Sequence, residues 1–550
     1  MFSPDEKKFA FVYKNDLYVK EIDTGKTIRI TDDGIKNKAI NGILIGCMKK
    51  KWALHGLSTG VPIVKKLVYF RFDQTAVAEQ PFLSYNQQIH SVISKIRYPK
   101  ARDSNSEVSV YYYSLENASI EKVNLRAYQE YYIPKILFTK NPDELALVIP
   151  NREQNQIDLL IVNTQNHDIK KILSEKIENY IETDHIELDS LEDNSFIWSS
   201  ERSGFRQLYH YYKDGKGSLN LTVSSTKLYG KNARKLSRKE NTNRAWLSKK
   251  FDYFIHKFSK IRETLVYSIY KTENSKLLYL LEDNKALKQN PQMTPLGAVE
   301  FKSIPNTSKG MLDGWMIKPR DFDKTKKYPL LVYVYDGPGS KIITDEWGGL
   351  NYLWFKILSQ KAYLIAAVDN RGTTKKGVAF KKIIYKNLGK YELEDQIKTA
   401  EHFDALSYVD SGESESSDGA SVGYLSCLEV TKSPGVFKTG IAVAPVTHWY
   451  SYNYIYTERY MRLPQENEKN YEENSPLNFE KNLKGNLLIL HGILDDNVHF
   501  RCILEMSRSL IEARKPFDFM AYSDKNYSIY GGATRHHLYN KMTRFILKNI

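Results

Sequence analysis

The stretch Leu487–Phe500 (LLILHGILDDNVHF) constrains the fold of this chain more than any other. Its apolar run Leu487–Leu490 is typical of a fully buried strand, and the chain then turns at His491-Gly492 into a loop that contains Asp495. A carboxylate on the loop that leaves a buried strand suits the acid of a Ser/His/Asp hydrolase, because there it can hold an imidazole in one tautomer. An ordinary polar loop is the alternative that these residues alone leave open.

The second half of the chain alternates between strand patterns and helix patterns. Buried-strand patterns occur in KYPLLVYVYDGPGS, AYLIAAVDN, NLLILHG and FDFMAYSD, and helix patterns occur in YELEDQIKTAEHFDAL and FRCILEMSRSLIEARK. Alternating βα units predict a mostly parallel, doubly wound sheet with helices on both faces, which is the α/β-hydrolase layout. We therefore predict an α/β-hydrolase domain over residues 293–550.

The first half reads as short strands separated by turn residues. Units of two or more strands recur about every 40 to 50 residues, which is the period of propeller blades. A β-sandwich is the alternative, but the number and the spacing of the units favour a β-propeller. We predict an incomplete propeller over residues 1–292, with its first blade or blades missing before Met1 and a deletion between Leu221 and Leu236.

Composition excludes several classes of protein. No apolar run is long enough to span a bilayer, and no signal-peptide pattern opens the chain. Cys47, Cys427 and Cys502 form neither a disulfide framework nor a metal-binding spacing, so we predict no metal and no cofactor. The formal charge of +15 comes with lysines spread along the chain, which favours a solvated surface over a nucleic-acid partner.

The segments around Leu487–Phe500 carry a family resemblance. Upstream lies GVFKTGIAVAPVTHWYSYNYIYTERYM (Gly435–Met461), and downstream lies YSDKNYSIYGGATRHHLYNKMTRFILKNI. With the HG…DDNVHF phrase, they resemble the dipeptidyl peptidase IV branch of the prolyl oligopeptidase family, and the resemblance runs from about Met1 to Ile550. It implies a β-propeller plus an α/β-hydrolase domain, and a serine exopeptidase that removes N-terminal dipeptides with proline or alanine in second place.

The same resemblance implies roles for individual residues. Asp495 matches the catalytic acid, and Asn497 matches a residue that contacts the substrate carbonyl. Tyr335 matches the donor to the oxyanion, where a fixed phenol stabilises charge that appears only in the transition state. A pocket for the proline ring is implied at Val446, Trp449, Tyr452, Tyr456 and Val498. Core packing is the alternative for these aromatic residues.

The catalytic base departs from the family pattern. Tyr527 stands at the position of the family's histidine. A phenol, whose ordinary pKa is about 10, cannot accept a serine proton at neutral pH as an imidazole does. We expect His536 and His537, which lie in the closing helix, to be surface or cap residues and not a relocated base.

The nucleophile departs as well. A G-x-S-x-G motif occurs at Gly419–Gly423 with Ser421 in its centre, and this motif requires a buried strand before it. The preceding residues, Ser411–Asp418, are polar and charged, and burying them would leave charges unpaired. We therefore interpret Ser421 as a chance match in a flexible loop, which makes it a doubtful nucleophile.

Local slips of the reading frame are a hypothesis that explains these departures. Suitable codons for Gly412–Gly423, read in a shifted frame, give RIGIFGWSFGG, an apolar strand with the family's serine motif. The same shift over Leu44–Lys51 gives DWVYEEE, the family's glutamate clamp for the substrate amine. Lys49–Lys51 then stand where anionic residues belong and would repel an ammonium group. We predict that Ile43–Val64 and Ser411–Gly423 sit poorly in the fold.

These observations lead to a functional expectation. The chain as written should hydrolyse Gly-Pro substrates negligibly, and Tyr527→His alone should recover little, because nucleophile and clamp would still be missing. A non-catalytic binding or scaffold protein on the same fold is the main alternative, and an unstable relic is a third. The resemblance implies peptide substrates with a free N-terminus, allows a homodimer, and suggests an exported protein.

Overall fold

The computed structural model describes residues 2–3, 5–42, 66–85, 89–223, 227–228, 242–248, 252–261, 263–290, 297–335, 337–410, 415–418 and 423–549. The chain forms two compact units, each built from several stretches. The first unit consists of Met1–Tyr229, Gly377–Leu388 and His448–Glu473, and the second of Gly230–Lys376, Gly389–Thr447 and Asn474–Ile550. The domain boundary at residues 292 and 293 remains a prediction.

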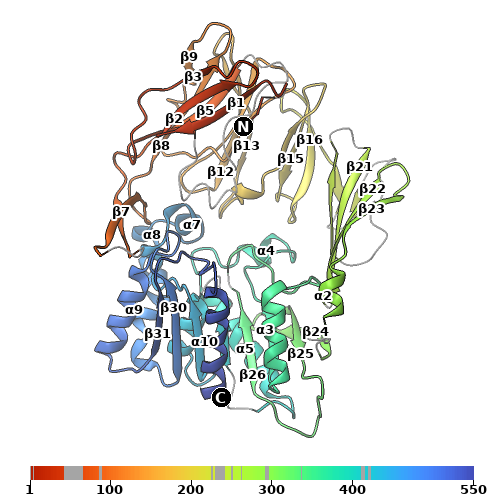
Figure 1. Ribbon diagram of the computed structural model, residues 1–550, viewed down its shortest axis with the longest axis vertical. Coiled ribbons are helices and arrows are strands. Elements are labelled where there is room, and N and C mark those ends of the chain that lie inside the picture. Colours follow the sequence, from red (N-terminus) through yellow and green to blue (C-terminus); the bar gives the residue numbers. More distant parts are fainter. Residues whose placement is uncertain are drawn as a thin grey trace. The chain divides into compact units, whose positions relative to one another are not determined.

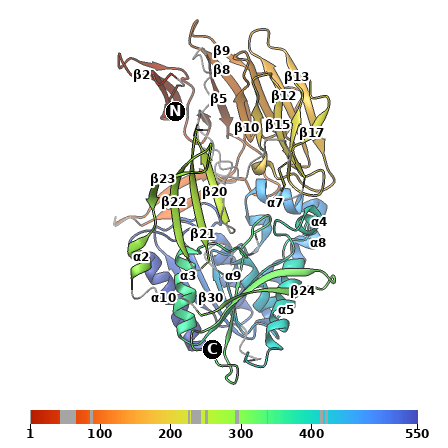
Figure 2. The ribbon, with the colours of Figure 1, turned by 90° about the vertical axis from the view of Figure 1, so that its right-hand side faces the viewer.

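The first unit contains a series of small antiparallel sheets (Figures 1 and 2). One sheet contains β1 (Lys8–Tyr13), β2 (Asp16–Glu21) and β3 (Thr27–Arg29), a second contains β4 (Ala39–Asn41), β5 (Lys66–Asp73), β8 (Glu107–Ser114) and β9 (Ile120–Lys122), and a pair is formed by β6 (Glu79–Ser84) and β7 (Val92–Arg97). The next sheet contains β10 (Lys135–Phe138), β11 (Glu144–Pro150), β12 (Gln156–Asn163) and β13 (Ile169–Lys176). It is followed by the sheet of β14 (Leu188–Ser190), β15 (Phe196–Ser200), β16 (Gln207–Tyr211) and β17 (Ser218–Asn220), and by the pair of β18 (Thr222–Val223) and β19 (Lys227–Leu228).

The alternation of side chains along β11 explains how these sheets stack. Leu145 and Leu147 enter one apolar cluster together with residues of β5 and β8. Ala146 and Val148, which point to the opposite face, enter a second cluster together with Trp198 of β15 and residues of β16. The sheet of β10 to β13 is therefore buried on both faces by its neighbours, as a propeller blade is, and Figure 2 shows β12 and β13 beside β15 and β17.

Two later stretches of the chain belong to the first unit. They contain α4 (Val378–Lys382), the short turn η3 (Trp449–Ser451), α7 (Tyr454–Met461) and α8 (Pro464–Glu473). Arg459 of α7 is buried and donates hydrogen bonds to Asp184 Oδ1 (2.8 Å) and Gln154 Oε1 (2.7 Å). Its neighbour Glu458 accepts a hydrogen bond from Arg152 Nε (2.7 Å). These ion pairs bind the YTERYM segment to the small sheets of the first unit.

An eight-stranded sheet forms the centre of the second unit (Figure 1). In spatial order its strands are β24 (Val299–Pro305), β25 (Met311–Ile317), β27 (Leu364–Asp369), β26 (Leu330–Val334), β28 (Glu415–Asp418), β29 (Thr439–Val443), β30 (Asn486–Gly492) and β31 (Asp518–Tyr522). All neighbouring pairs from β27 to β31 are parallel, and β24 and β25 add an antiparallel edge. The predicted mostly parallel sheet is confirmed.

Helices cover both faces of this sheet. On one face, α3 (Gly349–Gln360) and α10 (Thr534–Asn549) share an apolar cluster with Leu488 and Leu490 of β30. On the other face, α5 (Lys390–Asp404), α6 (Tyr424–Lys432) and α9 (Arg501–Glu512) pack with Leu487 and Ile489. All four apolar side chains are buried, so the prediction of a fully buried strand at Leu487–Leu490 is confirmed.

A separate four-stranded antiparallel sheet is also grouped with the second unit. Its strands are β20 (Thr242–Leu247), β21 (Tyr253–Lys260), β22 (Glu263–Lys271) and β23 (Leu277–Glu282), and the short helix α2 (Lys285–Gln289) follows. The end of β21 is bound to the segment before α3, because Trp347 N donates to Ser259 Oγ (2.9 Å) and Ile261 N donates to Asp345 Oδ1 (2.8 Å).

One expectation about the suspected slips is wrong. Residues 415–418 do not belong to a flexible loop, because they form β28 in the middle of the sheet and pair with β26 on one side and β29 on the other. The backbone ladder and the chain connections place this strand, although its sequence is polar. The other suspect segment, Ile43–Val64, lies outside the described residues. Within the described part of the chain, no helix is long and apolar enough to cross a membrane.

Candidate active site

Five of the predicted site residues follow the carboxyl ends of neighbouring strands. Tyr335 follows β26, Ser421 follows β28, Val446 follows β29, Asp495 follows β30 and Tyr527 follows β31. These five strands are adjacent and parallel, so their carboxyl ends lie at one edge of the sheet. In open α/β sheets this edge is where ligands bind. The structure thus brings the predicted segments to one edge, although Ser421 itself lies outside the described residues.

Asp495 is fully buried and held in one orientation. Its Oδ1 accepts hydrogen bonds from the backbone N–H groups of Asn497 (2.8 Å) and Val498 (3.0 Å). Its Oδ2 is buried, lies 3.3 Å from His491 Nε2 and makes no well-aligned hydrogen bond with the described residues. Burial raises the pKa of this carboxyl group, while His491 and the two N–H groups oppose the rise. One carboxylate oxygen therefore remains available to a further donor.

The loop that carries Tyr527 is bound to the loop of the acid. Leu494 N donates to Lys525 O (2.9 Å), and Ile493 N donates to Tyr522 O (3.0 Å). Gly492 permits this close approach, because a Cβ there would lie 2.6 Å from the carbonyl oxygen of Asn526. Position 527 thus lies two residues beyond a backbone contact with the acid loop. Tyr527 is half-buried there.

The G-x-S-x-G motif lies between β28 and α6. A strand before this motif and a helix after it are the context that a nucleophile elbow needs. Gly423, the last glycine of the motif, packs directly on β29: its N–H donates to Val443 O (3.0 Å), and a Cβ would lie 2.6 Å from Val443 N. This contact argues against the chance match that the sequence suggested.

Gly423→Ala is therefore expected to destabilise the protein. The added methyl would meet backbone atoms of β29, which cannot move without loosening the central ladder, and we expect a loss of about 1–3 kcal/mol in unfolding free energy. Gly435→Ala is the matched control, because its Cβ would meet nothing within 4 Å and its change should stay within about 1 kcal/mol. Urea unfolding followed by circular dichroism compares the two, and equal stability would contradict the close packing.

Tyr335 directly follows β26. Its ring lies against Gly337, since a Cβ there would be 3.2 Å from Tyr335 Cε1 and 3.5 Å from its hydroxyl oxygen. The missing side chain at residue 337 thus leaves room for the phenol. The predicted role of this hydroxyl at the oxyanion stays a prediction.

The predicted pocket residues lie in both units. In the first unit, Trp449, Tyr452 and Tyr456 form one aromatic cluster, with ring centroids 5.9 Å apart for Trp449–Tyr456 and 5.3 Å for Tyr452–Tyr456. In the second unit, Val446 and Val498 are buried. The aromatic residues are therefore brought together, whereas their use as a proline pocket remains a prediction. Lys49–Lys51 lie outside the described residues.

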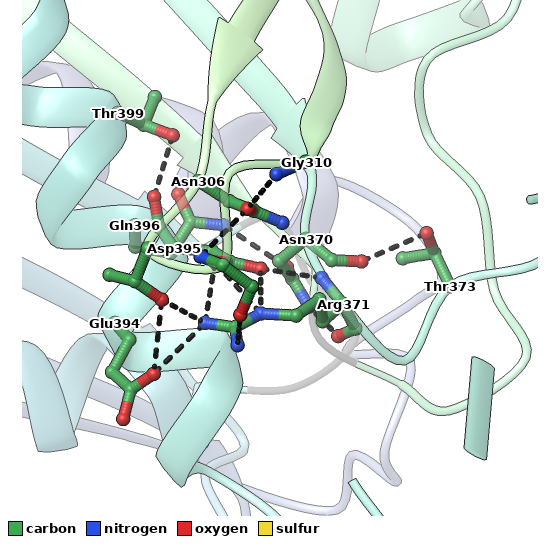
Figure 3. A network of polar contacts seen from close by, with 11 residues as sticks. Asn306, Gly310, Asn370, Arg371, Thr373, Glu394, Asp395, Gln396 and Thr399 are labelled. Atoms are coloured by element: carbon green, nitrogen blue, oxygen red, sulfur yellow. Dashed lines mark hydrogen bonds and ion pairs between the residues drawn. The ribbon is translucent and has the colours of Figure 1, made fainter. Parts of the chain in front are cut away.

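A buried polar network that was not predicted from the sequence surrounds Arg371 (Figure 3). Arg371, just after β27, forms an ion pair with Asp395 (2.8 Å) and another with Glu394 (2.9 Å). The backbone N–H of Arg371 donates to Asp395 Oδ2 (2.7 Å), and Gln396 Nε2 donates to Asn370 Oδ1 (3.1 Å). The signal was an arginine after a buried strand, in DNRG, together with two acids in the following helix, in ELEDQ.

This network fixes the loop after β27, which in turn contacts the loop after β26. Gly339 N donates to Gly372 O (3.0 Å), and Thr374 N donates to Ser340 O (3.0 Å). The loop that begins with Tyr335 is therefore held by a rigid neighbour. Burial raises the pKa of Asp395 even though Arg371 acts to lower it. Among the described residues, no group of His, Cys, Asp and Glu side chains could hold a metal ion.

Strand order, helix placement and the residues at the sheet edge define an α/β-hydrolase, and blade-like sheets accompany it. The Prolyl oligopeptidase family matches residues 351–550, and the Dipeptidyl peptidase IV (DPP IV) N-terminal region matches residues 1–228. The chain belongs to the dipeptidyl peptidase IV branch of the prolyl oligopeptidase family.

Individual relatives agree with this assignment. The chain is similar to dipeptidyl peptidase 4 of Felis catus (29% identity, covering 99% of this chain and 79% of the relative). It is also similar to prolyl endopeptidase FAP of Mus musculus (27% identity, 99% and 79% covered). The crystal structure of Porphyromonas gingivalis dipeptidyl peptidase 4 superposes with a TM-score of 0.94 at 33% identity, covering 100% of this chain and 82% of that chain.

Proposed function

We propose that this protein is a serine-type dipeptidyl peptidase that releases X-Pro and X-Ala dipeptides from peptides with a free N-terminus, and that Tyr527 impairs its catalysis. The observation that carries the proposal is the series of strand ends from β26 to β31, with Asp495 at the fourth of them. The relatives named above support the substrate class through their names.

Ser421 is proposed as the nucleophile. It follows β28 and precedes α6, and the tight contact of Gly423 with β29 supports an elbow at this place. In the reaction, the serine oxygen attacks the carbonyl carbon of the substrate's second residue, and the amine of the third residue leaves. The phenol of Tyr335 then donates a hydrogen bond to the oxyanion that forms.

Asp495 is proposed as the acid, and residue 527 is proposed as the position of the base. The free Oδ2 of Asp495 is the acceptor that an imidazole N–H would use to fix its tautomer. Tyr527 offers a phenol instead, which does not take the serine proton at neutral pH. The first proposed defect is thus a missing proton acceptor at position 527.

Binding of the substrate is proposed to follow the family. Asn497 contacts the substrate carbonyl, and the aromatic cluster of Trp449, Tyr452 and Tyr456 packs against the proline ring. Lys49–Lys51 lack the negative charge that would hold the substrate amine, which is a second proposed defect. The incomplete propeller over residues 1–292, the hydrolase domain over residues 293–550 and an exported location belong to the same proposal.

A substrate panel tests the proposed class. Protein carrying Tyr527→His is assayed with fluorogenic Gly-Pro, Gly-Ala and Gly-Gly substrates and with N-acetyl-Gly-Pro. We expect hydrolysis of Gly-Pro and Gly-Ala to exceed that of Gly-Gly at least about tenfold, because only the former fill the apolar pocket. Acetylation should abolish cleavage, because it blocks the free N-terminus. Equal cleavage of the acetylated substrate would instead indicate an endopeptidase.

A further inference from the structure

His491 is fully buried beside Asp495, and the proposed reaction does not use it. It is the next-to-last residue of β30 and pairs with Ala521 of β31. Its ring meets the ring of Phe500 edge to face, with centroids 5.6 Å apart and 84° between the planes. The strand and Phe500 therefore fix the imidazole in place, and a buried polar ring of this kind needs a hydrogen-bond partner.

The two ring nitrogens of His491 have different surroundings. Nε2 lies 2.9 Å from the carbonyl oxygen of Val498, and because a carbonyl oxygen only accepts, Nε2 is the nitrogen that carries the proton. Nδ1 is buried and makes no hydrogen bond with the described residues. A proton on Nδ1 would therefore be a buried donor without an acceptor, so the structure favours the tautomer with its single proton on Nε2.

The Nε2–H group closes the turn that carries the acid. The N–H of Val498 donates to Asp495 Oδ1 (3.0 Å), and its C=O accepts the hydrogen bond from His491. One residue of the loop is thus bound both to the acid and to β30. Because the Nε2–H bond is made to Val498 O, Asp495 Oδ2 stays open although it lies only 3.3 Å from Nε2.

The N–H group of His491 also acts on the charge of Asp495. Burial raises the pKa of this carboxyl group, and His491 is the first of the groups that oppose the rise, before the N–H groups of Asn497 and Val498. The adjacent Asp496 is solvent-exposed. An N–H group beside a carboxylate stabilises the ionised form, and this is the form that fixes an imidazole in one tautomer.

We propose that His491 is a positioning residue, whose Nε2–H holds the turn from Asp495 to Val498 and thereby keeps the acid oriented, with Oδ2 open to the base at position 527. This role rests on the proposed function, in which Asp495 is the acid. Asn497 lies within the same turn, so its proposed contact with the substrate carbonyl depends on the same bond. If the ring only filled space, a side chain of the same shape without a donor would serve equally well.

Three variants, each made in the Tyr527→His protein as parent, separate the donor from the ring. His491→Phe keeps a flat ring but has no donor, and His491→Met has neither. His491→Gln has nearly the shape of methionine and can place an N–H group where Nε2 lies. For a fluorogenic Gly-Pro substrate, kcat/KM should fall at least about tenfold in the first two variants, because a misplaced catalytic group loses much of its effect. The glutamine variant should stay within about threefold of the parent, because the bond to Val498 O is kept.

The pH dependence of stability tests the same bond without any catalysis. The three substitutions are repeated in the chain with Tyr527, and urea unfolding is measured between pH 5 and pH 8. Loss of the N–H group should raise the pKa of Asp495 in the folded protein further, so stability should fall more steeply as pH rises. The unfolding midpoint should therefore fall further for phenylalanine and methionine than for glutamine. All three variants lack the histidine, so its own titration cancels. With Asp495→Asn added, their slopes should be equal.

The outcomes separate this role from the proposed function. A phenylalanine variant as active as the parent would show that the ring only fills space. A glutamine variant as impaired as the other two, or equal pH slopes with Asp495 in place, would overturn the proposal. If the Tyr527→His parent is inactive, the proposed function fails, and the unfolding comparison alone decides the role of His491. Circular dichroism checks the fold, and the nearly isosteric methionine and glutamine variants remain decisive if the phenylalanine variant does not fold.

Discussion

Replacing Tyr527 by histidine is expected to raise kcat/KM for a fluorogenic Gly-Pro substrate by at least about 10²-fold over the unaltered chain. The loop of residue 527 is bound to the acid loop through Leu494 N and Lys525 O, and Asp495 Oδ2 is free to accept a hydrogen bond from the new imidazole. The sequence alone suggested little recovery, because the strand before Ser421 and the glutamate clamp for the substrate amine were both thought to be missing. β28 supplies that strand.

The controls for this result use the same background. Ser421→Ala or Asp495→Asn, combined with Tyr527→His, should return turnover to the level of the unaltered chain. Tyr527→Phe should gain nothing, since it adds no proton acceptor. The gained activity should rise with pH through about 6.5, because the imidazole must be neutral to act as the base. A gain that survives Ser421→Ala would show that another residue is the nucleophile.

Removing the guanidinium group of Arg371 is expected to be the most destabilising single change in the second unit. Arg371 and Asp395 are both buried, and Arg371→Met leaves the carboxylate without its ion-pair partner. We expect a loss of about 3–5 kcal/mol in unfolding free energy, measured by urea unfolding. Lys398 lies on α5, the helix that carries Asp395, and is the matched control. Lys398→Met breaks only the exposed ion pair with Glu401 and should lower the unfolding free energy by less than about 0.5 kcal/mol.

The pH dependence gives this prediction a second readout. Burial raises the pKa of Asp395 in the folded protein, and the loss of Arg371 would raise it further. When the pKa of a carboxyl group is higher in the folded than in the unfolded state, the protein loses stability as pH rises and regains it as pH falls. The Arg371→Met variant should therefore recover part of its stability between pH 8 and pH 5. Arg371→Met/Asp395→Leu should recover at least half of the loss at pH 7, and a double variant as unstable as the single one would contradict the assignment.

The sequence predicted the parts of the fold in which local pattern and burial agree. Leu487–Leu490 is apolar at every position, and as β30 it is buried on both faces. Glu415–Asp418 has no apolar residue, yet it occupies the slot between β26 and β29. Its place depends on the backbone ladder and on the lengths of the connections, which a window of residues does not reveal.

The site was predictable to a similar extent. The role of Asp495 was predicted from its position after a buried strand, and the departure at Tyr527 from the family phrase, and both roles stay predictions. No sequence pattern predicts that Asp495 Oδ1 accepts hydrogen bonds from Asn497 N and Val498 N. Nor does one predict that Asp495 Oδ2 makes no well-aligned hydrogen bond with the described residues. The same is true of buried Arg459, whose partner Asp184 lies far away in the sequence.

The division of the chain between the two units has a consequence for synthesis on the ribosome. The first stretch of the first unit ends at residue 229, but this unit also contains Gly377–Leu388 and His448–Glu473. Glu182 is buried against Lys381 and Arg459, which emerge about 200 and 280 residues later. Until then these two cations cannot offset the burial of this acid. The blade-like sheets should therefore complete their packing only after most of the hydrolase sequence has left the ribosome, so the N-terminal region cannot mature first.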